Sequence, residues 1–299
     1  MPLTSDLVGS SAPPMTHDID ARWTMAYAAA LGDMRPCYTD TRQPGGVVAH
    51  PLFPVCFEWP LIVAGRQLPG DDGLTLAERM RSIHATHDLH IHRPVRPGDR
   101  LTTCLTIVGV ERRKPGAYQM MRLDTTDASG LPVCTTWMGA LYRGVEVEGP
   151  DRPAAEAPSE PDPIGADAAA RSEIRVPVAA NLAHTYTECA RIWNPIHTDR
   201  AFAAAGGLPD IILHGTATLA LAVSRIVETE AAAIRHASGA SPPGSVRWCS
   251  CPRRSSSASS WSIKERCASR CATPGSGSQC ATTASSSTVR AGRAQGQSG

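Results

Sequence analysis

The spacing of apolar residues predicts that the first half of the chain is a helix followed by antiparallel strands. Residues 52–65 are almost continuously apolar, which predicts a buried helix. From Ile83 to Arg143 the pattern changes to alternation with a period of two, interrupted by turns rich in proline and glycine. Strands are expected at 87–92, 101–110, 118–125 and 133–142. Short antiparallel strands after one apolar helix predict a sheet that wraps round that helix.

A change of composition separates this unit from a second one. Residues 148–169 are rich in proline, alanine and acidic side chains, which is typical of a linker. Strand-like alternation begins again at 174–178, and residues 216–227 show apolar positions at helical spacing. The chain therefore predicts two units joined by a linker.

The second unit repeats the first. Six positions recur at a constant offset of 159 residues, and four of them are identical. The pairs are Tyr27 and Tyr186, Asp33 and Ile192, Pro36 and Pro195, Tyr38 and His197, Thr39 and Thr198, and Asp40 and Asp199. After a five-residue insertion, Val47–His50 corresponds to Ile211–His214. A duplication explains these matches, with the carboxylate kept in one copy and the histidine in the other.

The stretch from Tyr186 to Thr218 carries the candidate chemistry. Proline disfavours a helix at the residue before it, so Asn194 ends a helix and His197 lies on irregular backbone just beyond. His214 and Gly215 come directly before the second apolar helix, where backbone N–H groups are free and the dipole is positive. An imidazole that titrates near neutral pH beside such donors suits stabilisation of an oxyanion. For His197 alone, a hydrogen-bonded structural role is the alternative.

Residues Asn194–Asp199, followed by Ile212–Gly215, resemble the hydratase motif of the MaoC-like dehydratases, or (R)-specific enoyl-CoA hydratases. The resemblance implies a hotdog fold and chemistry on a thioester-linked acyl chain. In that family an aspartate two residues before the asparagine, together with the histidine, holds a water that is added to a 2-enoyl thioester or removed from a 3-hydroxyacyl thioester. A backbone N–H polarises the carbonyl. The aspartate position is Ile192 in this chain, and isoleucine cannot take or give a proton.

The resemblance implies roles for individual residues. His197 would be the acid or base, Asn194 would orient it or the water, and Asp199 would complete the catalytic set. For Asp199, capping of a helix that starts near residue 200 is an equal alternative. His214 and Gly215 would bind the substrate and its oxyanion.

Two other carboxylates are candidates to replace the one missing at Ile192. Asp33 is not expected to serve, because equivalent positions in a two-fold arrangement usually lie far apart. Glu188 lies one helical turn before Ile192 but is expected to be a solvated helix residue.

Repeat and resemblance together predict an α+β double hotdog, in which two antiparallel sheets each wrap round a central helix and the second sheet is incomplete. The expected parts are a degenerate hotdog at 1–147, the linker at 148–169, a hotdog that carries the motif at 170–240, and a tail at 241–299. The degenerate half is expected to widen an acyl pocket with Phe53, Phe57, Trp59 and Leu61.

Composition excludes several other classes of protein. The formal net charge is +1 over 299 residues, so no global charge favours nucleic acid or an anionic membrane. No apolar run approaches the roughly 20 residues that span a bilayer, and the N-terminus lacks the features of a secretory signal, so a cytoplasmic location is expected. Neither the histidines at 84, 87, 90 and 92 nor the cysteines have metal-site spacing, and no nucleotide fingerprint occurs. We therefore expect no metal and no cofactor other than the thioester substrate.

The tail has a different composition from the rest of the chain. Residues 245–299 contain fifteen serines, seven arginines, five cysteines and one acidic residue, without apolar alternation. Such a segment is expected to be disordered and unable to complete a sheet, which would leave the helix at 216–227 with an uncovered apolar face. Two tryptophans among scattered cysteines and arginines suggest a GC-rich coding region translated in the wrong frame from about residue 240. A basic tail that binds nucleic acid after phosphorylation is the alternative.

The predicted function is a hydro-lyase that acts on acyl-CoA or acyl-carrier-protein thioesters. Two alternatives remain open at this point: a non-catalytic acyl-thioester binding protein and a thioesterase on the same fold. The two units are expected to form a pseudo-dimer within one chain, and a homodimer of chains is compatible with that arrangement.

Overall fold

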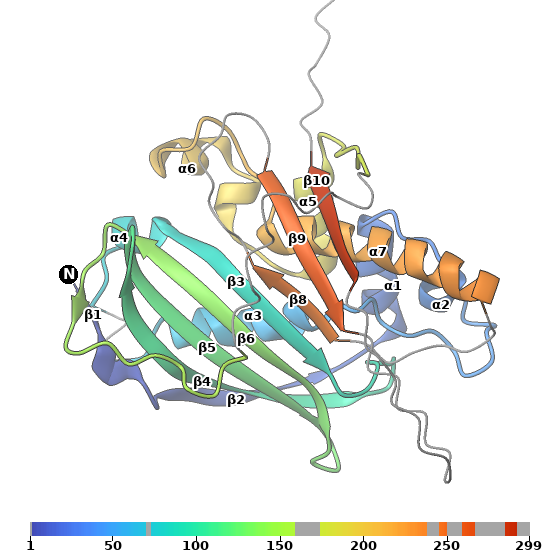
Figure 1. The fold of residues 1–299 in the computed structure, drawn as a ribbon, viewed down its shortest axis with the longest axis horizontal. Coiled ribbons are helices and arrows are strands. Elements are labelled where there is room, and N and C mark those ends of the chain that lie inside the picture. Colours follow the sequence, from blue (N-terminus) through green and yellow to red (C-terminus); the bar gives the residue numbers. More distant parts are fainter. Residues whose placement is uncertain are drawn as a thin grey trace, which may run out of the picture.

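In the computed structural model, one long antiparallel sheet lies against a layer of helices (Figure 1). The structure describes residues 2–69, 73–158, 174–237, 245–249, 259–266 and 285–291. The strands of the long sheet, in spatial order, are β10 (Ser285–Ala291), β9 (Ser259–Arg266), β8 (Ser245–Cys249), β3 (Ser82–Ile91), β6 (Pro132–Arg143), β5 (Gly116–Asp127), β4 (Arg100–Arg113) and β2 (Ser11–Asp18). A separate parallel pair joins β1 (Leu3–Thr4) to β7 (Val147–Glu148).

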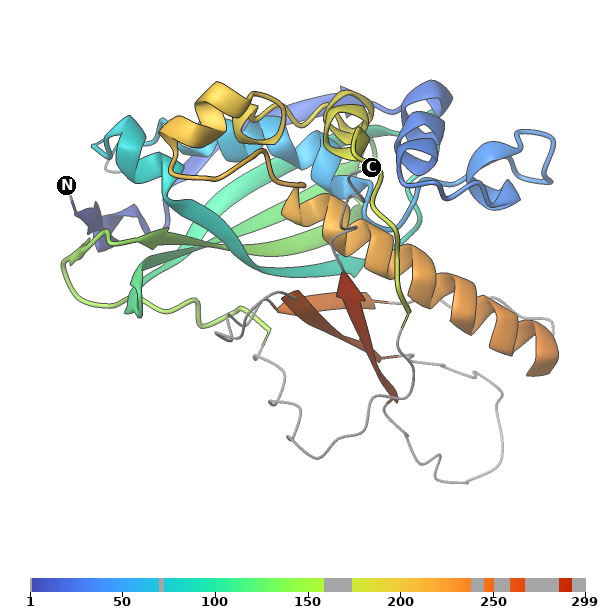
Figure 2. The ribbon, with the colours of Figure 1, turned by 90° about the horizontal axis from the view of Figure 1, so that it is seen from above.

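The helices belong to two groups that follow the predicted repeat. The first group is η1 (Ser5–Leu7), α1 (Ala21–Ala30), α2 (Pro36–Thr39), α3 (Pro54–Gly65) and α4 (Leu76–Met80). The second group is α5 (Leu182–Ala190), η2 (Pro195–His197), α6 (Arg200–Ala205) and α7 (Gly215–Ala237). Figure 2 shows α1, α3 and α5 gathered on the same side of strands β2 to β6.

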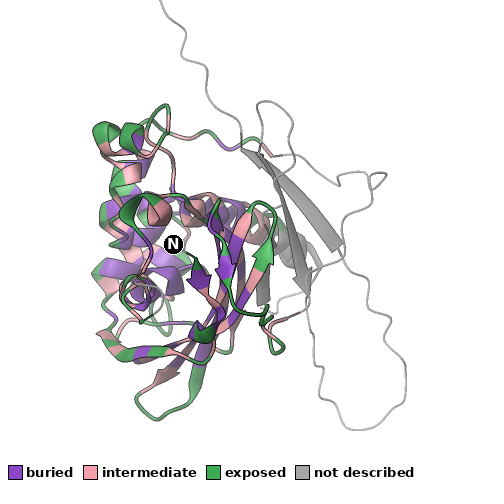
Figure 3. Cartoon of the chain, turned by 90° about the vertical axis from the view of Figure 1, so that its left-hand side faces the viewer, coloured by how far each residue is buried: buried purple, intermediate pink, exposed green. Residues whose placement is uncertain are grey.

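The first unit has the predicted architecture of a sheet wrapped round one apolar helix. Helix α3 is apolar on nearly every side, so it is stable only when it is buried on nearly every side. Strand β5 alternates as expected: Ala117, Gln119, Met121 and Leu123 are buried, and several of them pack in one cluster with residues of α3. Figure 3 shows that buried positions concentrate where the helices meet the sheet. The predicted α+β hotdog fold is confirmed.

The 159-residue repeat is visible in the backbone hydrogen bonds. Four bonds of the first copy recur at the corresponding residues of the second. In the first copy the N–H groups of Asp33, Tyr38, Asp40 and Val48 donate to the carbonyl oxygens of Ala28, Arg35, Pro36 and Cys37, respectively. In the second copy the N–H groups of Ile192, His197, Asp199 and Ile212 donate in the same order to the carbonyl oxygens of Thr187, Asn194, Pro195 and Ile196. Two segments that share this many local bonds have the same backbone path, so Tyr38 occupies the position that His197 occupies in the second copy.

The helices that open the two copies pack against each other. The Tyr27 and Tyr186 hydroxyls lie 3.3 Å apart, and their ring centroids are 5.6 Å apart. Beyond each helix a residue adopts left-handed backbone: Gly32 with φ 68° after α1, and Arg191 with φ 58° after α5. Left-handed backbone is unfavourable for residues that carry a Cβ, such as Arg191. The Arg191 guanidinium lies 4.1 Å from the centroid of the Trp23 ring, and this cation–π contact between the copies is a favourable interaction at the same residue.

The expectation that the second helix has an uncovered apolar face is wrong. Helix α7 begins at Gly215 and runs to Ala237, and residues 219–223 are all buried. They belong to the same apolar cluster as Tyr27, Phe53 and Tyr186. Helix α7 is covered because the two units share one core rather than each having a separate one.

The expectation that the tail supplies no strands is also wrong. Strand β8 pairs antiparallel with β3, β9 pairs with β8, and β10 pairs with β9. An edge strand such as β3 presents N–H and C=O groups to which extended backbone can bond whatever side chains it carries. The predicted disorder therefore fails for these three segments, while residues 241–244, 250–258, 267–284 and 292–299 lie outside the described residues.

The beginning of the predicted linker is attached to the sheet. Residues 149–158, here called the strap, run along β4, where Arg152 and Val110 exchange both backbone hydrogen bonds at 2.8 and 2.9 Å. A Cβ added at Gly109 would come within 2.9 Å of the Ala154 nitrogen, so this close approach requires glycine. The strap is thus held in place rather than free, and 159–169 lies outside the described residues.

A carboxylic acid lies in the middle of the first unit. Glu58 of α3 has almost no exposed surface and lies 2.6 Å from the Thr136 hydroxyl on β6. Burial raises the pKa of Glu58 from 4.5 to about 7, although the hydrogen bond from Thr136 opposes this shift. Glu58 is therefore largely protonated at mildly acidic pH in the folded state, whereas it ionises near its ordinary value in the unfolded chain.

This difference predicts a pH dependence of stability. Between the unfolded pKa of 4.5 and the folded pKa of about 7, only the folded state holds the Glu58 proton, so the free energy of unfolding falls as pH rises. Glu58→Gln keeps the shape and removes the ionisation. Urea unfolding measured at about pH 5 and about pH 8 should show that the free energy of unfolding falls more in wild type than in Glu58→Gln between the two pH values. Parallel pH profiles for the two proteins would contradict the assignment.

The reading-frame hypothesis for the tail stays a prediction. If residues beyond about 240 are encoded out of frame, resequencing the gene should reveal a one- or two-base change near that codon, and the restored product should be more soluble. An intact frame, together with a well-folded soluble product that carries the serine-rich tail in its mass spectrum, would refute the hypothesis.

Candidate active site

His197 is held at the end of a short 3-10 turn. Asn194 caps the turn, because its side-chain oxygen accepts a hydrogen bond from the Ile196 N–H at 3.4 Å, and Pro195 begins η2. The His197 ring is 8% exposed, with Nδ1 2.8 Å from the Ile212 carbonyl oxygen. A carbonyl can only accept, so Nδ1 carries the proton and Nε2 of the neutral ring keeps its lone pair.

His214 lies directly beneath this ring. The two imidazoles stack with centroids 3.6 Å apart and planes at 26°. The His214 Nε2 is 3.1 Å from the Thr187 hydroxyl oxygen and 3.3 Å from the Ile192 carbonyl oxygen. The carbonyl contact requires the proton on Nε2, which leaves Nδ1 of His214 as an acceptor.

Burial keeps both rings neutral near pH 7. Removal from water lowers the pKa of His197, and the hydrogen bond to Ile212 only partly opposes this shift. For His214, burial and then repulsion from His197 lower the pKa to about 3, despite the opposing hydrogen bond to Ile192. Near pH 7 each ring is therefore neutral and keeps the lone pair of one nitrogen.

The first turn of α7 adds hydrogen-bond donors. The first helical bond runs from the Thr218 N–H to the His214 C=O at 3.0 Å, so the N–H groups of Gly215 and Thr216 have no helical acceptor. Within the described structure, a Cβ built at Gly215 would meet no atom within 4 Å. There is room beside these donors, and the positive end of the helix dipole favours an oxyanion there.

The position of the family carboxylate is apolar. Ile192 is buried in the core cluster shared by the two units. Asp33, its counterpart, accepts a hydrogen bond from the Arg35 Nε at 2.7 Å and lies 3.9 Å from the His50 Nε2. His50 in turn bonds Ser224 on α7 at 3.0 Å, about 13 Å along the helix from Gly215 at 1.5 Å per residue. Asp33 is therefore remote from His197, as expected.

The first copy forms no equivalent base. Tyr38 takes the place of His197, and burial raises the pKa of its hydroxyl, so this group stays protonated. Burial alone would raise the pKa of Asp33, but hydrogen bonds from Arg35 and Ser224 lower it overall. The carboxylate is thus ionised and paired, which leaves the first copy without a free proton acceptor at this position.

Two predicted site residues have structural roles. The Asp199 carboxylate accepts hydrogen bonds from the Ala201 N–H at 2.8 Å and the Phe202 N–H at 3.0 Å, so it caps α6. The capping alternative holds, and nothing in this geometry connects Asp199 to the imidazoles. Glu188 is exposed on α5.

The four residues expected to line an acyl pocket are part of the core. Phe53, Phe57 and Leu61 have no exposed surface, and Trp59 is half-buried with the Arg66 guanidinium 5.4 Å from its ring centroid. Phe53 packs edge-on against Trp23, with the two ring centroids 5.1 Å apart. These side chains are packed in the core, and their role in an acyl pocket stays a prediction.

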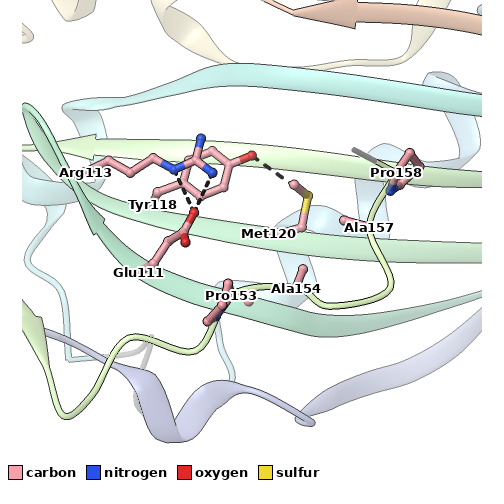
Figure 4. A pocket seen from close by; sticks show the side chains of 9 residues that line it. Glu111, Arg113, Tyr118, Met120, Pro153, Ala154, Ala157 and Pro158 are labelled. Atoms are coloured by element: carbon pink, nitrogen blue, oxygen red, sulfur yellow. Dashed lines mark hydrogen bonds and ion pairs between the residues drawn. The ribbon is translucent and has the colours of Figure 1, made fainter. Parts of the chain in front are cut away.

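A pocket of about 190 Å³ does occur elsewhere, between the strap and strands β4 and β5. In Figure 4, Glu111, Arg113, Tyr118 and Met120 line one side of it, and the strap lines the other. Tyr118 and Met120 alternate along β5 with residues that face α3, so this pocket lies on the opposite face of the sheet from the helices. It is separate from the imidazole pair.

The remaining histidines form no recognisable metal site. Within the described ranges no three His, Cys, Asp or Glu side chains lie together in a way that could hold a metal ion. His84 and His87 pack edge-on with centroids 5.2 Å apart, and the His90 Nε2 lies 3.1 Å from Asp88. In the same part of the chain, no helix has the length and hydropathy needed to cross a bilayer.

Sequence reasoning missed two hydroxyl residues, Thr187 and Ser224. Thr187 fixes the His214 ring from α5, and Ser224 reaches His50 from α7. Neither lies in the motif, and Thr187 corresponds to Ala28 in the first copy, so no pattern along the chain marks them.

Family models match both halves of the chain, and curated proteins match part of it. Residues 6–136 match the family model "FAS1-like, dehydratase domain region", and residues 164–240 match "MaoC like domain". A UPF0336 protein of Streptomyces coelicolor is 31% identical over 150 residues, which cover 49% of this chain and 99% of that protein. The enoyl-CoA hydratase ChsH3 of Mycobacterium tuberculosis is 26% identical over 162 residues, 54% of this chain and 53% of that enzyme.

Solved structures show the same fold. A MaoC-like dehydratase from Phytophthora capsici superposes with a TM-score of 0.64 at 17% identity, covering 88% of this chain and 91% of that one. HtdX of Mycobacterium tuberculosis superposes with a TM-score of 0.53 at 16% identity, covering 94% of this chain and 100% of that one. With both halves matched by dehydratase family models and with these structural neighbours, the chain belongs to the MaoC-like dehydratase family.

Proposed function

We propose that the protein is a hydro-lyase that interconverts 2-enoyl thioesters and 3-hydroxyacyl thioesters of coenzyme A or an acyl carrier protein. The observation that carries the proposal is the neutral His197, whose Nε2 lone pair is free because the Ile212 carbonyl holds the Nδ1 proton. This base lies beside the N-terminus of α7, where N–H groups can donate hydrogen bonds to an oxygen that gains negative charge. The family to which the chain belongs supports a hydratase or dehydratase role.

The proposed hydration step balances with one base. The His197 Nε2 takes a proton from water as the water oxygen bonds to C3 of the enoyl chain. The C2–C3 π electrons move toward the thioester carbonyl, whose oxygen gains negative charge near the Gly215 N–H. The imidazolium then gives its proton to C2, which restores neutral His197. One oxyanion donor of this kind contributes on the order of 3 kcal/mol.

A binding protein without catalysis is the second candidate, favoured by one observation. Ile192 replaces the family carboxylate, and no carboxylate of the described residues is recorded as bonding either imidazole. A thioesterase would need a carboxylate directed at a water near the carbonyl, and neither Asp199 nor Asp33 is so placed. Incubation with crotonyl-CoA separates the three: loss of the enoyl absorbance supports a hydratase, thiol release a thioesterase, and tight binding alone a binder.

The cellular setting stays a prediction. A place in fatty acid metabolism follows from the proposed reaction class. The cytoplasmic location rests on the sequence features given above, and the homodimer of chains on the resemblance, and each needs its own measurement.

Substitution of the two corresponding rings tests the base. His197→Ala should lower the rate of crotonyl-CoA hydration by roughly 100- to 10,000-fold, because a general base contributes about that much. Tyr38→Phe is the matched control in the other copy and should leave the rate within about threefold of wild type. Equal losses in both variants would show that the two rings matter for folding rather than for chemistry.

The pH profile tests the same assignment without a substitution. The pKa of His197 is lowered from 6.5 by burial, and the ring acts as a base only when neutral. The value of kcat/KM should therefore be flat around neutral pH and should fall on the acid side, with a midpoint below 6.5. A rate that rises as the pH is lowered through this region would exclude His197 as the base.

A further inference from the structure

Two histidines occupy the same place in the two copies and use their nitrogens differently. In the first copy, the His50 Nδ1 accepts a hydrogen bond from the Leu52 N–H at 3.1 Å, and its Nε2 lies 3.0 Å from Ser224. Both nitrogens are thus satisfied, as expected for a buried packing residue. In the second copy, His214 uses only Nε2, and its buried Nδ1 has no hydrogen-bond partner among the described residues.

The polarity of this unpartnered nitrogen can be read from its surroundings. The Ile192 carbonyl at 3.3 Å needs a donor, so the proton is on Nε2 and Nδ1 offers a lone pair. His214 is only 2% exposed, so bulk water does not satisfy this lone pair. The group that fits there must donate an O–H or N–H, whereas a thioester oxygen or an oxyanion would be repelled.

The position of His214 connects it to the missing carboxylate. Its Nε2 contacts the backbone of Ile192, the residue that stands where the family has an aspartate. Its ring stacks on that of His197 with centroids 3.6 Å apart, so the unpartnered Nδ1 belongs to the immediate surroundings of the proposed base. A neutral imidazole nitrogen and a carboxylate oxygen are both hydrogen-bond acceptors, although only the carboxylate carries charge.

We propose that Nδ1 of His214 accepts a hydrogen bond from the reacting water, or from the substrate 3-hydroxyl in the reverse direction, and so takes the acceptor role vacated at Ile192. This inference rests on the proposed hydro-lyase function and identifies the residue that replaces the absent carboxylate.

The proton balance then closes on two imidazoles with separate tasks. Water has two O–H bonds: the proton of one passes to the His197 Nε2 as the oxygen bonds to C3. The other O–H bond is never broken, donates to the His214 Nδ1 throughout and becomes the 3-hydroxyl of the product. His197 returns its proton to C2, so His214 holds the water in place without itself changing protonation state.

The variants exploit the repeat. His214→Phe keeps a flat ring against His197 but removes the acceptor, and His50→Phe is the control at the equivalent buried position. Ile192→Asp restores the family carboxylate and is combined with His214→Phe. Each protein is purified as the full chain, checked for folding by circular dichroism and assayed for hydration of crotonyl-CoA.

We expect kcat to fall about 100-fold in His214→Phe, a loss typical for removal of a group that holds the reacting water, with His50→Phe close to wild type. In the double variant, Ile192→Asp should raise kcat at least about tenfold above that of His214→Phe. A purely structural role for His214 predicts no such recovery, because a carboxylate at position 192 would not restore lost packing. Wild-type rates in His214→Phe, or equal losses in both phenylalanine variants without rescue, would overturn the inference and leave the hydro-lyase proposal standing. A wild-type protein that turns over neither crotonyl-CoA nor 3-hydroxybutyryl-CoA would overturn both.

A second measurement is independent of activity and of variant stability. Nitrogen-15 spectra of histidine-labelled wild type distinguish a protonated ring nitrogen from a bare one. The resonances of His214 should report a proton on Nε2 and none on Nδ1 near neutral pH. A proton found on Nδ1 would refute the proposal, whatever the kinetics show.

Discussion

The contact between α1 and α5 is the constraint on which the rest of the structure depends. Tyr27 and Tyr186 bring their hydroxyls within 3.3 Å of each other, and the apolar cluster around them includes residues of α3 and α7. Because these helices share one core, neither copy can move without exposing apolar surface of the other. The Arg191 guanidinium on Trp23 adds a second connection across the same boundary.

This shared core separates backbone from chemistry in the two copies. Equivalent hydrogen bonds hold equivalent loops, so the chain presents the same framework twice. The side chains on that framework have diverged: Asp33 is neutralised by Arg35, whereas His197 keeps a free lone pair. The same framework therefore carries a neutral imidazole in one copy and an ion-paired carboxylate in the other.

Burial, rather than charge pairing, determines the state of the imidazoles. Both rings are largely withdrawn from water, and the hydrogen bonds from their protonated nitrogens go to backbone carbonyls, which are neutral. A buried carboxylate at position 192 would have favoured the imidazolium form, whereas isoleucine leaves both rings neutral. Isoleucine thus removes a charge from this position while His197 keeps its lone pair.

The sequence by itself determined the apolar helix at α3, the alternating strands of the first unit, the 159-residue repeat and the motif around His197, because these depend on local periodicity and residue type. It left open whether Asp199 caps a helix, whether β3 finds a partner in a tail without apolar alternation, and which nitrogen of His214 carries the proton. Only the tertiary structure decided these points. Each depends on groups brought together from distant parts of the chain or on backbone hydrogen bonding that no side-chain pattern records.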